Sequence, residues 1–124
     1  MAYRDLGLMD TRPARLGIDW LAAQQNSDGG FGGNLRDHSS VEETAAAIEA
    51  LLAEVGTTTG GTNKPLQAVT DKGLRWLVEA VEQARVAETS PIGFYFAKLW
   101  YYEKLYPLTF ATATLRRAVE NSKR

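Results

Sequence analysis

The sequence contains no cysteine and only one histidine, and these two absences exclude several kinds of chemistry. Without cysteine the chain can form no disulfide bond and no thiolate metal site. His38 stands alone beside Asp37, an arrangement more typical of a surface loop than of a general base. We therefore expect no bound metal and no cofactor, and a cysteine-free chain is compatible with a reducing compartment.

Long apolar runs and runs of one charge are also missing. No stretch approaches the ~20 apolar residues that cross a bilayer, and the first residues lack the apolar core of a secretory signal. The 14 basic and 15 acidic residues are interspersed, with a net charge of -1, so no basic patch indicates nucleic acid binding. We expect a cytoplasmic protein without a transmembrane segment.

Length and periodicity predict one small helical domain that spans residues 1–124. A chain of 124 residues that is 44% hydrophobic can bury one modest core. Apolar residues recur at steps of three and four, and no segment alternates convincingly as a strand, so we expect an all-α fold. The expected helices cover residues 16–25, 40–55 and 65–84, a segment from Ser90 that breaks near Tyr106 and Pro107, and a last segment from Leu108.

Helix start signals support three of these segments, and one of them is at residues 90–91, a serine cap followed by a proline in the first turn. Ser40 and Glu43 have the spacing of a capping box, and Pro65 suits a first helical turn. The adjacent pair of Glu42 and Glu43 is also conceivable as a metal site. However, neighbours on a helix point about 100° apart, and capping already explains Glu43.

The most informative run lies in residues 24–33, which read Gln-Gln-Asn-Ser-Asp-Gly-Gly-Phe-Gly-Gly after the first helix. Glycines let the chain leave a helix through positive φ. We call residues 24–33 the corner. The Gln25 amide can bond backbone groups left unpaired at a neighbouring helix end, and Phe31 can cover the corner. We interpret Trp20, Gln25, Gly30 and Phe31 as structural braces rather than catalytic groups.

Part of this pattern occurs twice. Residues 16–21 read Leu-Gly-Ile-Asp-Trp-Leu, and residues 72–77 read Lys-Gly-Leu-Arg-Trp-Leu, at an offset of 56 residues. The second copy lacks the corner, because residues 82–89 read Glu-Gln-Ala-Arg-Val-Ala-Glu-Thr. The sequence therefore predicts an internal repeat with a degraded second unit.

The order of Trp20, Gln25, Asp28-Gly-Gly30 and Phe31 resembles the glutamine–tryptophan repeat of squalene-hopene cyclases and related terpene cyclases. Residues 90–107, rich in aromatics and closed by Tyr-Pro, are similar to the segment before the last helix of those enzymes. The resemblance covers nearly the whole chain but only the carboxy-terminal part of the longer enzymes. Phe31 stands where the family usually has tryptophan.

The resemblance implies antiparallel helical hairpins forming part of an α/α toroid, and a relation to polycyclic triterpenoid (hopanoid) biosynthesis. Seven of the twelve aromatic residues lie in the span 94–106. In the cyclases the matching segment contributes rings that stabilise carbocations. Phe94, Tyr95 and Tyr102 fall nearest those positions, whereas the residues themselves favour core packing and an interface.

The catalytic acid of the cyclases is missing. Their protonating motif, Asp-x-Asp-Asp, lies outside the part resembled and does not occur in this chain. Related protein prenyltransferases hold zinc with Asp, Cys and His, which a cysteine-free chain cannot copy. The resemblance thus implies an inactive isolated chain, and catalytic residues are unknown.

Two classes of function stay open. The first is a cyclase-related isomerase component, as a fragment, a stand-alone relative or a subunit of a split enzyme. The second is a non-catalytic module that binds an isoprenoid, another lipid or a protein. A piece of two hairpins leaves uncovered end faces, so we expect a homo-oligomer or a partner chain that completes the toroid.

Overall fold

The structure is a computed structural model that describes residues 2–33, 37–55, 63–94 and 99–123, the side chains of residues 92–101 excepted. Most of the described residues are helical, which confirms the predicted helical class. The elements are α1 (Ala2–Asp5), α2 (Arg12–Ala23), α3 (Val41–Val55), α4 (Lys64–Glu82), the 3-10 turn η1 (Arg85–Ala87), β1 (Pro91–Phe94), β2 (Leu99–Tyr102) and α5 (Leu105–Ser122).

The starts of α3 and α4 follow the sequence signals. The Asn63 side chain accepts a hydrogen bond from the Leu66 amide at 3.2 Å, and Ser40 Oγ accepts one from the Glu43 amide at 3.2 Å. The second half of the predicted capping box does not form, because the Ser40 amide instead donates to the Phe31 carbonyl. That bond ties the loop before α3 back to the corner.

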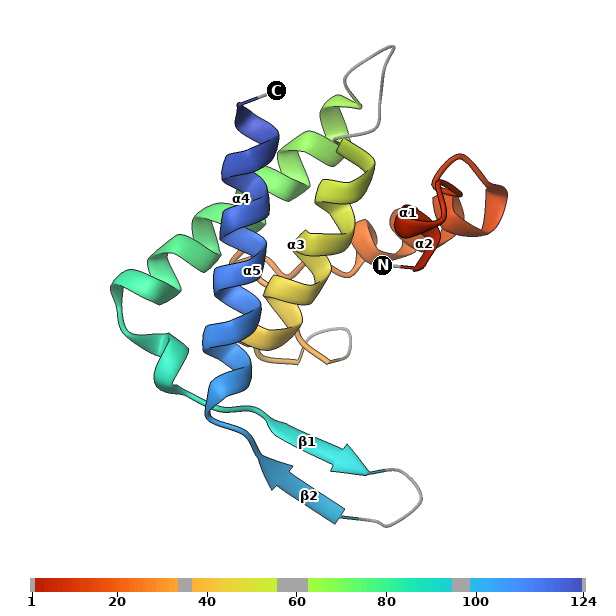
Figure 1. Ribbon diagram of the computed structural model, residues 1–124. Helices are drawn as coiled ribbons and strands as arrows, with labels where there is room; N and C mark the ends of the chain where they lie inside the picture. Colours follow the sequence, from red (N-terminus) through yellow and green to blue (C-terminus); the bar gives the residue numbers. More distant parts are fainter. Residues whose placement is uncertain (1, 34–36, 56–62, 95–98, 124) are drawn as a thin grey trace.

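Helix α3 is the centre of the helical body, with α5 running beside it in the same direction (Figure 1). Two hydrogen bonds fix this pairing: Thr114 Oγ1 donates to the Ala45 carbonyl at 2.9 Å, and Asn121 Nδ2 donates to the Leu52 carbonyl at 3.2 Å. Helix α4 crosses α3, while α2 lies on the side of α3 away from α5 (Figure 1). The helix pairs α2–α3 and α4–α5 thus stack on each other, and their second members run in parallel.

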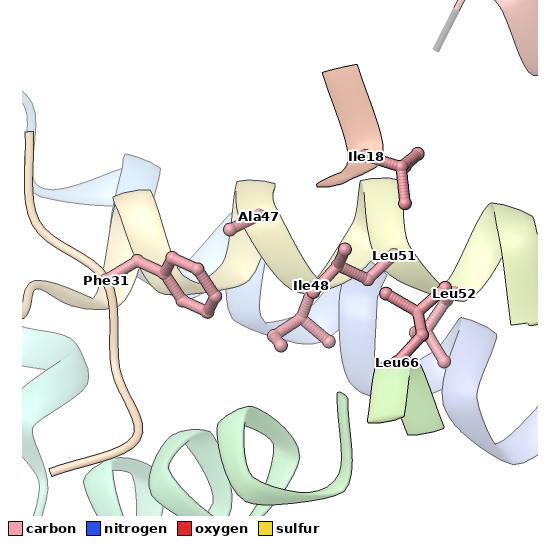
Figure 2. Packing of buried hydrophobic residues seen from close by; sticks show 7 residues of the cluster. All are labelled: Ile18, Phe31, Ala47, Ile48, Leu51, Leu52 and Leu66. Atoms are coloured by element: carbon pink, nitrogen blue, oxygen red, sulfur yellow. The ribbon is translucent and has the colours of Figure 1, made fainter. Parts of the chain in front are cut away.

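The core lies on both sides of α3. Figure 2 shows the larger cluster, in which α3 supplies Ala47, Ile48, Leu51 and Leu52, and α2, the corner and α4 supply Ile18, Phe31 and Leu66. A second cluster joins α3 to α4 and α5 through Val41, Ala45, Trp76, Leu77, Ala80 and Ala111. Since α3 is apolar on several faces, it can contact three helices at once.

The predicted helix from Ser90 is wrong. Residues 91–94 and 99–102 form an antiparallel hairpin in which Pro91 pairs with Tyr102 and Phe94 pairs with Leu99. The hairpin projects from one end of the helical body (Figure 1). Ile-Gly-Phe and Leu-Trp-Tyr-Tyr are rich in β-branched and aromatic residues, which fit a pleated strand better than a helix.

The predicted break near Tyr106 and Pro107 is also wrong, because this dipeptide lies in the first turn of α5. A proline is accepted there, since first-turn amides have no partner within their helix. Helix α5 therefore begins before the position at which the sequence placed its start, and Pro107 is buried.

Candidate functional site

The corner after α2 clamps the two helix pairs together through Gln25. Gln25 Nε2 donates hydrogen bonds to the Gly29 carbonyl at 2.9 Å and to the Val69 carbonyl at 2.8 Å. Val69 lies within α4, so the glutamine bonds a neighbouring helix as predicted, although its acceptor is in the helix interior and not at an unpaired end. One side chain thus fixes both the shape of the corner and its distance from α4.

Two glycines let the corner approach α4 closely. Gly29 has a φ of 99°, a backbone conformation that residues with a side chain rarely adopt, and a Cβ there would meet Lys72. A Cβ on Gly30 would lie 2.8 Å from Cε2 of Trp76. The predicted role of the Gly-Gly pair is therefore steric as well as conformational.

Asp28 collects three hydrogen bonds at the same corner. Its Oδ1 accepts from the Gly30 amide at 3.0 Å and from Ser39 Oγ at 2.8 Å, and its Oδ2 accepts from Trp76 Nε1 at 3.0 Å. Partial burial raises the pKa of Asp28, but these three bonds and the nearby Arg85 charge outweigh it, so the pKa lies below its usual value. The carboxylate is a fixed acceptor for the indole and unsuited to donate a proton at neutral pH.

Three of the four predicted brace residues meet at the corner. Phe31 is only 2% exposed, and its amide donates to Thr44 Oγ1 at 2.9 Å, while Gln25 and Gly30 lie against α4. Trp20 is not part of this assembly, because it is 65% exposed on α2. Trp76, its counterpart in the second repeat unit, fills the corner instead.

The three residues predicted to bind a ligand lie in or beside the hairpin. Phe94 ends β1 and pairs with Leu99, whereas Tyr102 ends β2 at the other end of the register, beside Pro91. Tyr102 is 64% exposed. Tyr95 and the side chain of Phe94 lie outside the described residues. The described part of the segment is thus a projecting hairpin. Phe94 and Tyr102 lie at opposite ends of its paired region, separated by three residue steps of about 3.3 Å each.

A polar cleft of about 520 Å³ opens beside the corner, a volume within the usual range of small-molecule sites. Its lining includes Asp37, His38, Glu43, Trp76 and Arg85. The Arg85 guanidinium carbon lies 4.5 Å from the centre of the Trp76 ring, in a cation–π contact.

Glu43 is the unusual titratable group of this cleft. Burial raises the pKa of Glu43 above its usual value, and the charges of Glu42 and Asp37 raise it further. Its Oε2 is shielded from solvent and has no hydrogen-bond partner among the described residues. The sequence predicted only a capping role for Glu43, and capping does not account for the shielding of its Oε2. The sequence signal that could have revealed the raised pKa is the neighbouring carboxylate of Glu42.

Glu42 itself has a structural role. Its carboxylate accepts hydrogen bonds from the Ser90 amide at 3.0 Å and from Ser90 Oγ at 3.1 Å, which ties the start of α3 to the segment that leads into the hairpin. Within the described residues, no group of three or more His, Cys, Asp or Glu could hold a metal ion. Nor does any helix described here have the length and apolar character needed to cross a membrane.

The geometry of the site consists of a hydrogen-bonded corner, a projecting hairpin rich in aromatic residues and a polar cleft. No protein-family model, no curated protein and no solved structure matches this chain.

Proposed function

We propose that this chain is a squalene-hopene-cyclase-like module, related to polycyclic triterpenoid biosynthesis, that forms part of an α/α toroid. The observation that supports this proposal most is the corner, where Gln25, Asp28 and Phe31 join the first helix pair to the second. A glutamine and an aromatic residue brace successive helix pairs in the repeat that the sequence resembles. The parallel course of α3 and α5 also fits stacked repeat units.

In this proposal the isolated chain does not catalyse cyclisation. Protonating an alkene needs a strong acid, and the sequence lacks Asp-x-Asp-Asp. Asp28 is committed to hydrogen bonds, and a carboxyl such as Glu43, in a polar cleft, is far too weak an acid for this step. The chain would supply one aromatic wall of a cytoplasmic cyclase whose acid comes from a partner chain that completes the toroid.

A non-catalytic module that binds an isoprenoid or another lipid is the second candidate. The exposure of Tyr102 on a projecting hairpin favours it, because an exposed aromatic side chain is available to a ligand or partner. Both candidates use the hairpin as their contact surface. The first takes part in cyclisation and needs a second chain that supplies the acid, whereas the second only binds a ligand and needs no second chain.

The test is a titration of the full chain with squalene and with a hopanoid, read by tryptophan fluorescence and by mass analysis of the extract. We expect saturable quenching without product. The Tyr102→Ala variant should bind more weakly, while Tyr3→Ala, a matched control on α1 with 45% exposure, should not change binding.

Each other outcome has a distinct meaning. A cyclised product from the chain alone would overturn the assignment of the acid to a partner. No saturable binding of either compound would overturn the isoprenoid-binding role and leave protein partners as the remaining class. Equal effects of the two tyrosine variants would exclude the hairpin as the binding surface.

A further inference from the structure

The two repeat units place the same residue types at equivalent positions of α2 and α4. Gly17 and Trp20 on α2 correspond to Gly73 and Trp76 on α4, at the offset of 56 residues. Each glycine lies three residues before its tryptophan, so both residues share one helix face. The environments of these two faces differ completely.

On α4 this face is packed against the first repeat unit. Gly73 is buried, and a Cβ there would clash with the Ile48 side chain of α3. Trp76 is 5% exposed and donates its indole hydrogen to Asp28 of the corner. Here the glycine permits close approach, and the tryptophan anchors the helix in the Asp-Gly-Gly corner of the preceding unit.

On α2 the same face is open. A Cβ on Gly17 would meet nothing within 4 Å, Trp20 is 65% exposed, and Leu16 beside them is 56% exposed. Helix α2 lies at the edge of the helical body, on the far side of α3 from α5 (Figure 1). Glycine in the middle of a helix is less favourable than alanine, and nothing described around Gly17 compensates for this.

The contacts of Trp76 on α4 indicate what kind of unit would cover the equivalent face of α2. Trp76 is received by a carboxylate that accepts from the indole, by glycines that admit the ring, and by a glutamine that bonds the helix backbone. A second copy of this chain cannot offer such a corner. Its intact corner already holds Trp76, and the second unit has Ala-Arg-Val at residues 84–86 in place of Asp-Gly-Gly.

We infer that the face of α2 formed by Leu16, Gly17 and Trp20 is a docking surface for another helical repeat unit, one that carries an intact Gln…Asp-Gly-Gly-aromatic corner. The partner's aspartate accepts the Trp20 indole hydrogen, its glycines admit the Trp20 ring, and an apolar side chain in the place of Ile48 packs on Gly17. This surface follows from the internal repeat alone, so a failure of isoprenoid binding leaves it untouched.

The test supplies that neighbour within one protein. A copy of residues 8–63 is inserted between Gly7 and Leu8, which keeps the offset of 56 residues, so that the original α2 follows an added unit with an intact corner. We expect the lengthened chain to unfold in urea in a single transition with a larger m-value, because the added unit packs on the original one. We also expect the indole proton of the original Trp20 to exchange with solvent several-fold more slowly than in the unmodified chain.

The matched control uses one substitution in two places. Asp28→Ala in the added copy should abolish the protection of the original Trp20 indole, whereas Asp28→Ala in the original copy should expose Trp76 and leave Trp20 protected. Two separate unfolding transitions, together with an unprotected Trp20, would overturn the docking surface. If the original Trp20 indole stays protected despite Asp28→Ala in the added copy, the Asp-Gly-Gly corner is not what covers this face of α2.

A second measurement needs only the natural chain. Trp20→Lys and Gly17→Leu should leave its urea midpoint nearly unchanged, while Gly73→Leu should lower it strongly or prevent folding. A large loss of stability from Trp20→Lys would mean that the face is already covered within this chain. A dimer of the natural chain that Trp20→Lys dissociates would show a second copy as the occupant, and either result refutes the inference.

Discussion

The indole Nε1 of Trp76 lies 3.0 Å from Oδ2 of Asp28 and donates a hydrogen bond across 48 residues of sequence. The bond connects α4 with the corner after α2, so it crosses the boundary between the two repeat units. The guanidinium of Arg85 covers the same indole ring. Trp76 is therefore both a core residue and the anchor that fixes the second unit on the first.

Replacing Trp76 by phenylalanine should destabilise the chain by at least about 1.5 kcal/mol, because Asp28 loses a charge-assisted hydrogen bond. The loss of ring volume adds to this cost. Trp20→Phe is the matched control and should stay within about 0.5 kcal/mol, since Trp20 is exposed. Urea unfolding followed by circular dichroism measures both values, and equal costs would contradict the anchoring role.

Asp28 should make the stability of the chain sensitive to acid. Its pKa is lowered in the folded state, so folding favours the charged carboxylate. The resulting stabilisation is present above the pKa of aspartate in the unfolded chain and is lost as the pH falls through the lowered folded value. The Asp28→Asn variant should be less stable at neutral pH and should approach the natural chain in acid. A constant difference across the pH range would count against this assignment.

Periodicity was sufficient to predict the four long helices, because each carries an apolar stripe, and start signals placed the beginnings of α3 and α4. The corner was predicted from its glycines, whose effect on the backbone is local, and from the Gln25 amide, although the sequence did not identify its acceptor, the Val69 carbonyl 44 residues away. The position of α1 was not predictable, because Arg4 reaches Glu49 at 2.9 Å, 45 residues away. No pattern in neighbouring residues encodes such a contact.

The hairpin was missed for a different reason. Residues 91–102 contain aromatics at spacings that also fit a helix, and short apolar runs are ambiguous between the two states. Pairing of β1 with β2 resolves the ambiguity in favour of strands. The cleft was missed because it depends on Trp76 and Glu43, which approach each other only when α4 packs on the start of α3.

Gln25→Glu should destabilise the chain more than its small change in shape indicates. The amide nitrogen donates to two carbonyls, of Gly29 and Val69, and a carboxylate oxygen in its place would face two acceptors. We expect a cost of about 2 kcal/mol or more from the lost bonds and the repulsion. Gln83→Glu, an exposed control after α4, should be nearly neutral in the same urea titration. A similar cost for both would show that the clamp contributes little.

Self-association should occur through α5 and the hairpin rather than through α2. Helix α5 exposes Leu105, Leu108 and Phe110, and Tyr102 precedes it with 64% exposure. Large apolar side chains exposed in this number favour association. Light scattering at tens of micromolar should give a mass above that of the monomer, and Phe110→Lys should lower it. A monomeric natural chain would refute this prediction, as would a dimer insensitive to Phe110→Lys.

Glu43 should give the opposite pH dependence to Asp28. Burial and the neighbouring charges raise its folded pKa, so folding favours the protonated form, and stability decreases as the pH rises from the unfolded pKa through the folded one. Glu43→Gln should therefore stabilise the chain at neutral pH, with a gain that shrinks in acid. Glu79→Gln, on the exposed face of α4, is the control for replacing a carboxylate by an amide at a solvated position. If Glu43→Gln destabilises the chain at neutral pH, the carboxylate has a stabilising contact that the cleft geometry does not contain.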